Sequence, residues 1–346
     1  MQKISPDNSP FQEKQADFLL AACVTHTCEI PLLTQAGIPG KVPLTPTLDA
    51  EFLSTGKVFS LGDIAETPKG VPTPALITRA VHELSPFEDL QVLDLGMIEK
   101  PRQCKLVDLD LKPTPSITDD EAFDAKAVFE KGFAYGKRYR LKGDYLILAE
   151  STPSGTTTAQ AAVTALGYET KGLFSSSFKD TPQGIKQKSI DKALSKLHPN
   201  MALFEKLGHT ADNMLLFVAG FILSASRRFD IVLAGGTQMA AALMISDRIS
   251  ARQAIHHDHR RIHLCTTKWI AEDEHSDIQA LIDQLDFRLK AYYADFSFAD
   301  ANHPALKLYD EGEAKEGVGA GAATAYAYSR GISQEVLTKK IETYLK

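Results

Sequence analysis

A repeated order of short apolar strand, polar or glycine-rich loop and helix constrains this chain most. Residues 145–149 form a short apolar run, which is followed by the loop 150–158 and by a helix of small residues over 159–166. The same order recurs with the apolar run 230–234, the loop 235–238 and a helix over 239–245, and more weakly at 263–267. Short apolar strands that alternate with helices predict a doubly wound α/β fold with a mostly parallel sheet.

The rest of the chain fits around this sheet. A buried strand is expected at 92–95, an amphipathic helix at 119–139 and a buried helix at 214–225. Seven prolines between residues 31 and 74 leave little room for long regular elements, so the first 75 residues are expected to wrap or line something. We expect a large α/β domain over 41–309 and a smaller accessory unit formed from both chain ends, residues 1–40 and 310–346.

Charge and composition exclude several classes of protein. The 38 Lys and Arg residues against 44 Asp and Glu give a net charge of −6, and no basic block offers a footprint for nucleic acid. The longest apolar stretch has about half of the ~20 residues needed to span a bilayer, so no membrane partner is expected. Four cysteines without a CxxC pair indicate neither a disulfide scaffold nor a zinc site, which favours a reducing cytoplasm.

Three loops that precede helices are rich in glycine or threonine, at 154–158, 235–238 and 317–321. Free amides at a helix start, with glycines that let a ligand approach the backbone, can bind an anion. None of these loops has the P-loop or dinucleotide-binding pattern, which disfavours an NTPase or a dehydrogenase. Tight packing of small residues between helix and sheet explains a single loop of this kind equally well, but three together favour a binding role.

Two glutamates flank these loops, Glu150 directly after a predicted strand and Glu316 directly before a glycine. A carboxylate at a strand end in apolar surroundings can have a raised pKa, which suits a general base near neutral pH. A capping or salt-bridging role is the more common one for an arbitrary glutamate. The position at the carboxyl edge of a parallel sheet, where ligands bind, favours function here.

The histidine-rich segment 256–263 does not match a metal site. It lacks the H-E-x-x-H pattern and any accompanying cysteine pair, and its neighbours Arg260 and Arg261 would repel a cation. A solvated helix end is the better interpretation. We therefore expect neither a metal nor a cofactor.

Four segments together resemble one family. Ala149-Glu-Ser-Thr-Pro-Ser-Gly-Thr-Thr-Thr-Ala159, Ser175-Ser-Ser177, Leu233-Ala-Gly-Gly-Thr-Gln-Met239 and Thr73-Pro-Ala-Leu-Ile-Thr-Arg79 resemble the nicotinate-nucleotide-dependent phosphoribosyltransferases, with the closest match to an archaeal and cyanobacterial branch. Lys315-Glu-Gly-Val-Gly-Ala320 is similar to the Gly-Glu-Gly-x-Gly-Ala signature of the family, although Lys315 stands in place of its first glycine.

The resemblance implies an enzyme that transfers phosphoribose from nicotinate mononucleotide to a benzimidazole-like or purine-like base, as in activation of the lower ligand of cobamides. It implies that Glu316 is the catalytic base, that Glu150 is the second active-site glutamate and that the protein is a homodimer. The side chain of Lys315 would either hold Glu316 ionised or reach a ligand phosphate. The alternatives are a non-catalytic nucleotide-binding regulator and another enzyme that transfers or hydrolyses nucleotide N-glycosyl bonds.

The candidate site therefore combines Glu316 and Glu150 with a set of polar and glycine residues. The substrate-binding candidates are Ser151, Gly155, Thr156, Thr157, Thr158, Ser175, Ser176, Ser177, Lys186, Lys188, Gly235, Gly236, Thr237, Gln238, Gly317 and Gly319. The amides and threonines would hold the 5′-phosphate, and Lys186 or Lys188 would complete its neutralisation. A flat acceptor base needs an apolar wall, and the proline-rich first part of the chain is its expected source.

Overall fold

The structure is a computed structural model that describes residues 1–346 except 7, 9, 12, 181 and 346. Within the described residues, all strands belong to one parallel sheet in the order β1-β8-β7-β6-β5-β2-β3-β4. The strands are β1 Gln2–Ile4, β2 Ala16–Ala22, β3 Asp89–Asp94, β4 Leu106–Asp108, β5 Tyr145–Ser151, β6 Asp230–Ala234, β7 Ile262–Thr267 and β8 Lys290–Ala294. The predicted doubly wound α/β fold is confirmed, and the sheet is parallel throughout.

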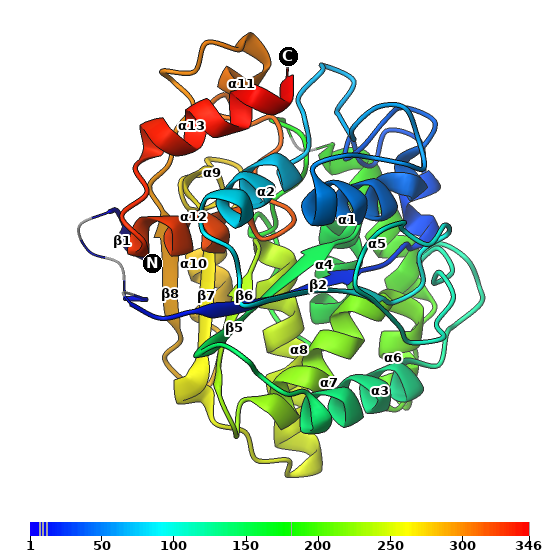
Figure 1. The fold of residues 1–346 in the computed structure, drawn as a ribbon. Helices are drawn as coiled ribbons and strands as arrows, with labels where there is room; N and C mark the ends of the chain where they lie inside the picture. Colours follow the sequence, from blue (N-terminus) through cyan, green and yellow to red (C-terminus); the bar gives the residue numbers. More distant parts are fainter. Residues whose placement is uncertain (7, 9, 12, 181, 346) are drawn as a thin grey trace.

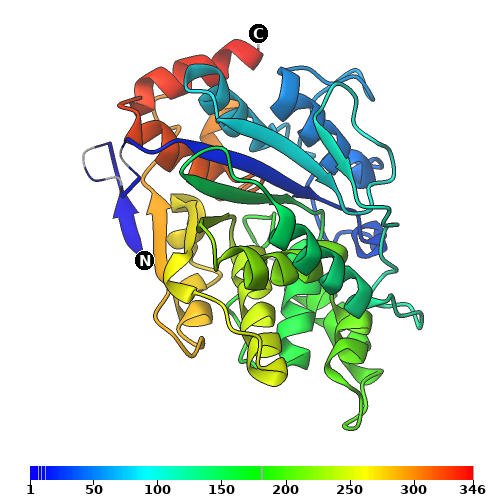
Figure 2. The ribbon, with the colours of Figure 1, turned by 60° about the horizontal axis from the view of Figure 1, so that its bottom comes forward.

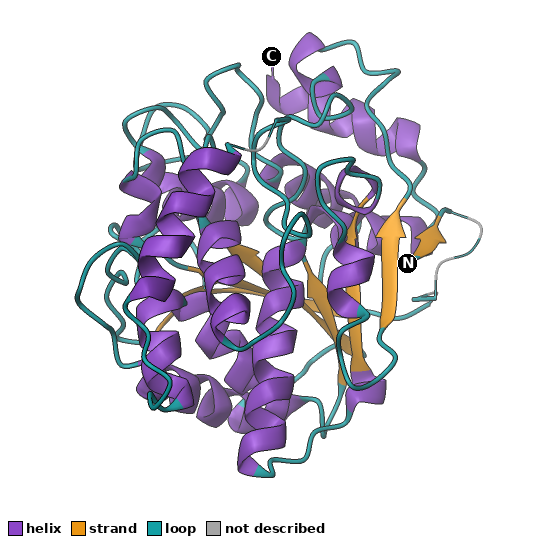
Figure 3. Cartoon of the chain, turned by 180° about the vertical axis from the view of Figure 1, so that it is seen from behind, coloured by secondary structure: helices purple, strands orange, loops and turns teal. Residues whose placement is uncertain are grey.

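Helices cover both faces of the sheet (Figures 1 and 3). Successive strand residues point to opposite faces, so in β5 Leu146 joins the core of one face and Ile147 that of the other. The first face carries α3 Ala125–Arg138, α4 Gly155–Ala165, α7 Asn213–Ala225, α8 Thr237–Gln253 and α10 Ile278–Ile282, and α5 Gln183–Ser195 and α6 Leu203–Thr210 pack against α4. Because both faces are buried, the central strands β5 and β6 carry apolar residues on both faces, over 145–149 and 231–234.

The opposite face is covered by helices from both ends of the chain. These are α1 Thr45–Thr55, α2 Ala75–Leu84, α11 Pro304–Lys307, α12 Ala320–Ser329 and α13 Gln334–Glu342. The short helix α9 Lys268–Ala271 follows β7, and the 3₁₀ turns are η1 His26–Glu29, η2 Val42–Leu44, η3 His259–Arg261 and η4 Thr343–Leu345.

Some predicted boundaries differ from the structure. The helix expected over 119–139 begins only at Ala125, because the Asp124 carboxylate accepts a hydrogen bond from the Ala127 amide at 3.0 Å and caps the helix there. The helix of small residues starts at Gly155 rather than 159. The proline-rich first part still contains the 11-residue α1, because Pro46 lies in its first turn, where the missing N–H costs nothing.

Both chain ends contribute to the sheet or to the helices that pack on it: β1 and β2 are strands, and α12 and α13 pack on one face. β2 lies between β5 and β3 in the sheet, and β1 forms the outer edge beside β8 (Figure 2). The division into a large domain over 41–309 and a small one from 1–40 and 310–346 stays a prediction. Within the described part of the chain, every helix is too short or too polar to cross a lipid bilayer.

Candidate active site

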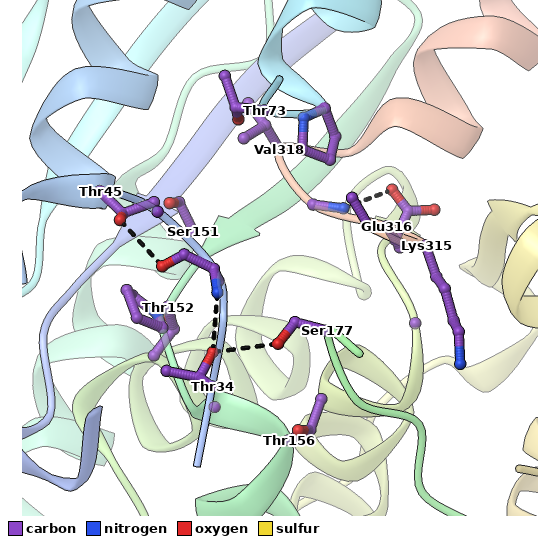
Figure 4. Close-up of a pocket in the computed structure, with 18 of the residues that line it drawn as sticks. Thr34, Thr45, Thr73, Ser151, Thr152, Thr156, Ser177, Lys315, Glu316 and Val318 are labelled. Carbon is purple, nitrogen blue, oxygen red and sulfur yellow. Dashed lines mark hydrogen bonds between the residues drawn. The ribbon is translucent and has the colours of Figure 1, made fainter. Parts of the chain in front are cut away.

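A pocket opens at the carboxyl edge of the sheet, where β5 and β6 end and α4 and α8 begin (Figure 4). β2 and β5 are neighbours, but the chain proceeds from β2 toward β4 on one side and from β5 toward β8 on the other. This reversal of strand order is the place where open α/β sheets bind ligands. The lining comes from residues 33–34, 36–37, 45, 49, 65–67, 71–74, 150–156, 175–177, 236–238, 270 and 314–318.

Most of the predicted site residues meet in this pocket. The lining includes Glu150, Ser151, Gly155, Thr156, Ser175, Ser176, Ser177, Gly236, Thr237, Gln238, Glu316 and Gly317. The predicted residues Thr157, Thr158, Lys186, Lys188, Gly235 and Gly319 do not line it. The fold thus brings together Glu150, Glu316 and the predicted segments around 150–156, 175–177 and 236–238, which are far apart in the sequence.

Glu316 is held by the loop that carries it and by the end of β7. Its Oε1 accepts hydrogen bonds from the amides of Gly317 and Gly321 at 3.1 and 3.3 Å. Its Oε2 accepts from the Thr267 amide at 2.8 Å and from the Thr266 hydroxyl at 3.1 Å. Burial raises the pKa of Glu316 to about 7, and these hydrogen bonds oppose the rise.

The third glycine loop was expected to bind an external anion, and here the structure gives a correction. Two of its amides, those of Gly317 and Gly321, already donate to the chain's own carboxylate, Glu316. Gly319 packs directly on the sheet, since an added Cβ would lie 2.8 Å from Cβ of Ala149. The glycines of this loop therefore fix a glutamate and fit a helix against strands.

Glu150 lies at the end of β5 and is 4% exposed. Burial raises its pKa to about 8, and the negative charges of Glu316, Asp212 and Asp49 add to the rise. Asp212 caps α7 and accepts a hydrogen bond from the Thr158 hydroxyl at 2.5 Å, which turns Thr158 away from the pocket. Near neutral pH, Glu150 is therefore mostly protonated and able to donate a hydrogen bond.

Asp49, on α1, is a pocket residue that the sequence did not indicate. It is 3% exposed, and its two oxygens accept from the hydroxyls of Thr73 and Ser151, both at 2.7 Å. Burial raises the pKa of Asp49 to about 6. Thr73 and Ser151 both lie in segments that resemble the phosphoribosyltransferase family, and this was the only hint that they share a site. Nothing in the sequence shows that Asp49 lies between them.

The first turns of α4 and α8 are close together in the pocket. Thr237, which starts α8, contacts the Ser175 hydroxyl at 3.0 Å between hydroxyl oxygens, and this links the serine triplet to the helix. Ser177 accepts a hydrogen bond from the Gln35 amide at 3.0 Å, and so ties the triplet to the first part of the chain. The two helix N-termini present amides and a positive dipole end to the same cavity.

The side chain of Lys315 pairs with Asp273 and not with Glu316. Its ammonium lies 3.0 Å from each carboxylate oxygen of Asp273, and its side chain extends away from that of Glu316 (Figure 4). Lys186 is also buried and donates to the Ser175 carbonyl at 3.0 Å, and burial together with the charge of Lys315 lowers the pKa of Lys186 to about 7. Lys188 is exposed on α5.

The expected apolar wall is present. Leu33, Ala65, Val71 and the prolines 72 and 74 come from the first part of the chain and line the pocket. Pro74 also lies against Gly317, where an added Cβ would be 3.5 Å from the proline Cγ. The wall is thus next to the loop that carries Glu316.

Three non-glycine residues of the pocket have a left-handed backbone. Their φ angles are 63° at Ser154, 62° at Ala314 and 51° at Val318. Each such residue costs roughly 1–3 kcal/mol and persists only where the surrounding structure requires it. Strain of this kind clusters at functional sites.

The histidine segment lies elsewhere, after α8. The His257 ring contacts the Ser250 hydroxyl at 3.1 Å and packs against Phe287. Among the residues that the structure describes, no group of three or more His, Cys, Asp or Glu side chains is arranged to hold a metal ion. That the segment binds no metal stays a prediction.

Comparison with known proteins identifies the family of the chain and the solved structures that share its fold. No family model matches it. The UPF0284 protein of Sulfurisphaera tokodaii is 36% identical, with 97% of this chain and 93% of that protein covered, and the UPF0284 protein of Archaeoglobus fulgidus is 33% identical, with 97% and 95% covered. A crystal structure of nicotinate-nucleotide-dimethylbenzimidazole phosphoribosyltransferase from Thermus thermophilus aligns with a TM-score of 0.59 at 14% identity, covering 97% of this chain and 84% of that one. A structure of CobT from the same organism gives 0.59 at 16%, covering 95% and 85%. The chain thus belongs to the UPF0284 family, and its fold is that of the nicotinate-nucleotide-dimethylbenzimidazole phosphoribosyltransferases.

Proposed function

We propose that the protein transfers phosphoribose from nicotinate mononucleotide to a benzimidazole-like or purine-like base, releasing nicotinate and forming an α-riboside phosphate for a cobamide. The observation that carries this proposal is the pair Glu316 and Glu150, two carboxyl groups with raised pKa values in one pocket. The apolar wall and the two helix N-termini beside them suit a flat base and a phosphate. The shared fold supports the reaction class.

The chemistry needs one base. Nicotinate leaves as a neutral ring nitrogen when its bond to C1′ breaks, so no acid has to protonate it. The incoming azole nitrogen forms the new bond to C1′, and the proton on its other ring nitrogen passes to Glu316. Glu150, which is protonated near neutral pH, lines the same pocket and would donate a hydrogen bond to a ribose hydroxyl.

Glu316 must first free a lone pair for that proton. A carboxylate has about four lone-pair sites, and four donors occupy them here. The longest of these hydrogen bonds, 3.3 Å from the Gly321 amide, is the one that yields most easily when the acceptor base arrives. The other three would keep the carboxylate oriented.

The phosphate would lie at the N-termini of α4 and α8, near Thr156, Gly236 and Thr237. Lys186 would stabilise the phosphate site indirectly, because its ammonium donates a hydrogen bond to the carbonyl of Ser175, and the Ser175 side chain contacts Thr237. We also expect a cytoplasmic homodimer that needs no cofactor.

The test is incubation of the purified protein with nicotinate mononucleotide and a panel of bases, followed by chromatography. Base-dependent release of nicotinate together with a new riboside phosphate supports the proposal. Release of nicotinate without a riboside product would identify a hydrolase, and tight binding without any release would identify a regulator.

A further inference from the structure

Two polar atoms in the pocket, Ser154 Oγ and Gln238 Oε1, are buried without a hydrogen-bond partner among the described residues. Ser154 is 6% exposed. Buried polar atoms in folded proteins are nearly always paired, since leaving one unpaired costs free energy comparable to a lost hydrogen bond. Two such atoms in one pocket indicate that a ligand completes them.

The two side chains lie at the same point, where α4 and α8 begin. A Cβ added to Gly155 would lie 1.9 Å from Gln238 Oε1 and 2.6 Å from Gln238 Cδ. The Gln238 amide thus sits directly over the residue that follows Ser154. Gly155 permits this close approach, and its own φ angle is not left-handed.

The conformation of Ser154 is also unusual. It occupies the N-cap position of α4, yet its backbone is left-handed, with φ 63°, and its hydroxyl caps no amide of the helix. Serine at an N-cap ordinarily accepts a hydrogen bond from the first turn. Here the hydroxyl is kept from the helix at the cost of backbone strain, and it remains available to the pocket.

The chemistry of Gln238 Oε1 selects what it binds. An amide oxygen only accepts hydrogen bonds, and a fully ionised phosphate has no proton to donate. The ligand group must therefore carry an O–H or N–H. The Ser154 hydroxyl both donates and accepts, so it can pair with the oxygen of the same group.

We propose that Ser154 and Gln238 form a subsite for a hydroxyl group of the ligand's sugar, in which Gln238 accepts from the hydroxyl and Ser154 donates to it. That the sugar is a ribose rests on the proposed function. The subsite makes Gln238 a specificity-determining residue, because a deoxy sugar would leave its oxygen buried and unpaired.

The test is calorimetric titration of nicotinate mononucleotide and its 2′-deoxy and 3′-deoxy forms into the wild type and Gln238→Leu. Gln238→Leu should weaken binding of the parent nucleotide by about tenfold or more but leave one of the deoxy forms unaffected, because that form has already lost the contact.

A structural role would give a different result. Removing an unpaired buried polar group should not destabilise the protein, so Ser154→Ala and Gln238→Leu should keep the Tm of the ligand-free wild type or raise it. Thr164→Val is the control: its hydroxyl is bonded to the Gln160 carbonyl at 2.7 Å, outside the pocket, so this variant should lower Tm without changing nucleotide binding.

Two results would overturn the subsite. Equal losses for all three nucleotides with Gln238→Leu would show that no hydroxyl is recognised. Failure of the wild type to bind either nicotinate mononucleotide or ribose 5-phosphate would also overturn it. Failure of the proposed function looks different: the binding differences would persist while no base yields a riboside product.

Discussion

Lys315 and Asp273 form an ion pair in which each side chain is only 3% exposed, with the ammonium 3.0 Å from both carboxylate oxygens. The pair connects the loop before α12 to the segment after α9, directly beside Glu316. The lysine that replaces a glycine in the family signature thus fixes the backbone of the loop through a buried ion pair at the side of the pocket.

Removing one partner of this pair should be costly. Lys315→Met leaves Asp273 buried without its cation, and we expect a loss of about 3–5 kcal/mol in the free energy of unfolding, measured with urea. The exposed pair Lys339 and Glu335 provides the control, and Lys339→Met should change stability little. If the two variants were equally stable, the buried pair would not hold the loop.

Glu316→Gln should lower turnover by about 10²–10⁴-fold with little change in nucleotide affinity, because glutamine keeps the shape but cannot take the azole proton. Initial rates and calorimetric affinities measure the two effects separately. Glu311→Gln, an exposed change on the same segment, should behave as the wild type. Near-normal turnover of Glu316→Gln would move the role of base to Glu150.

The rate should depend on pH in a bell shape. Glu316 must be ionised, so kcat/KM rises as the pH passes about 7, and Glu150 acts as a hydrogen-bond donor while protonated, so the rate falls above about 8. The two carboxyl groups interact, so the apparent pKa of each limb of the profile is a property of the pair and not of one residue. Glu150→Gln should remove the alkaline limb, and a profile that kept this limb would contradict the assignment.

Stability should fall as the pH rises from about 5 to about 8. The folded state keeps a proton on Glu150 up to about 8, whereas the unfolded chain loses it near the ordinary value of 4.5, so the folded state binds more protons in this range. Asp49, with its pKa raised to about 6, acts in the same direction. Thermal melts of Glu150→Gln should show a shallower fall than the wild type, while Glu335→Gln should not differ from it.

Gly155→Ala should weaken nucleotide binding without unfolding the protein. The added Cβ would collide with the Gln238 amide, a side chain that can move, so the damage falls on the pocket. In a Gln238→Ala background the same change should have little further effect, which a double-mutant cycle would measure. Gly184→Ala is the control, because nothing lies within 4 Å of a Cβ there.

The sequence predicted the sheet and the segments that form the pocket because both follow from local patterns. Apolar runs such as 145–149 and the loops after them define strand ends, and parallel strands bring those ends to one edge. Asp49 could not be found this way, since its role depends on contacts with Thr73 and Ser151 that only the fold creates.

The directions in which side chains point were the other feature that the sequence could not predict. Thr158 belongs to the predicted phosphate loop, but its hydroxyl turns to Asp212, and Lys188 is exposed because its neighbour Lys186 takes the buried face of α5. The glycine loop before α12 looked like an anion site, and its amides in fact bind Glu316. Such partners lie far apart in sequence, so spacing alone does not identify them.

The strand order also determines when each strand can join the sheet while the chain is being synthesised. β2 pairs with β3, which is made soon afterwards, and β5, β6, β7 and β8 then add outward in the order of their synthesis. β1 is different: Gln2 pairs with Tyr292, so a strand that precedes β2 in the sequence can pair only after β8 has been made. This outer edge of the sheet therefore closes only after residues 290–294 have been made.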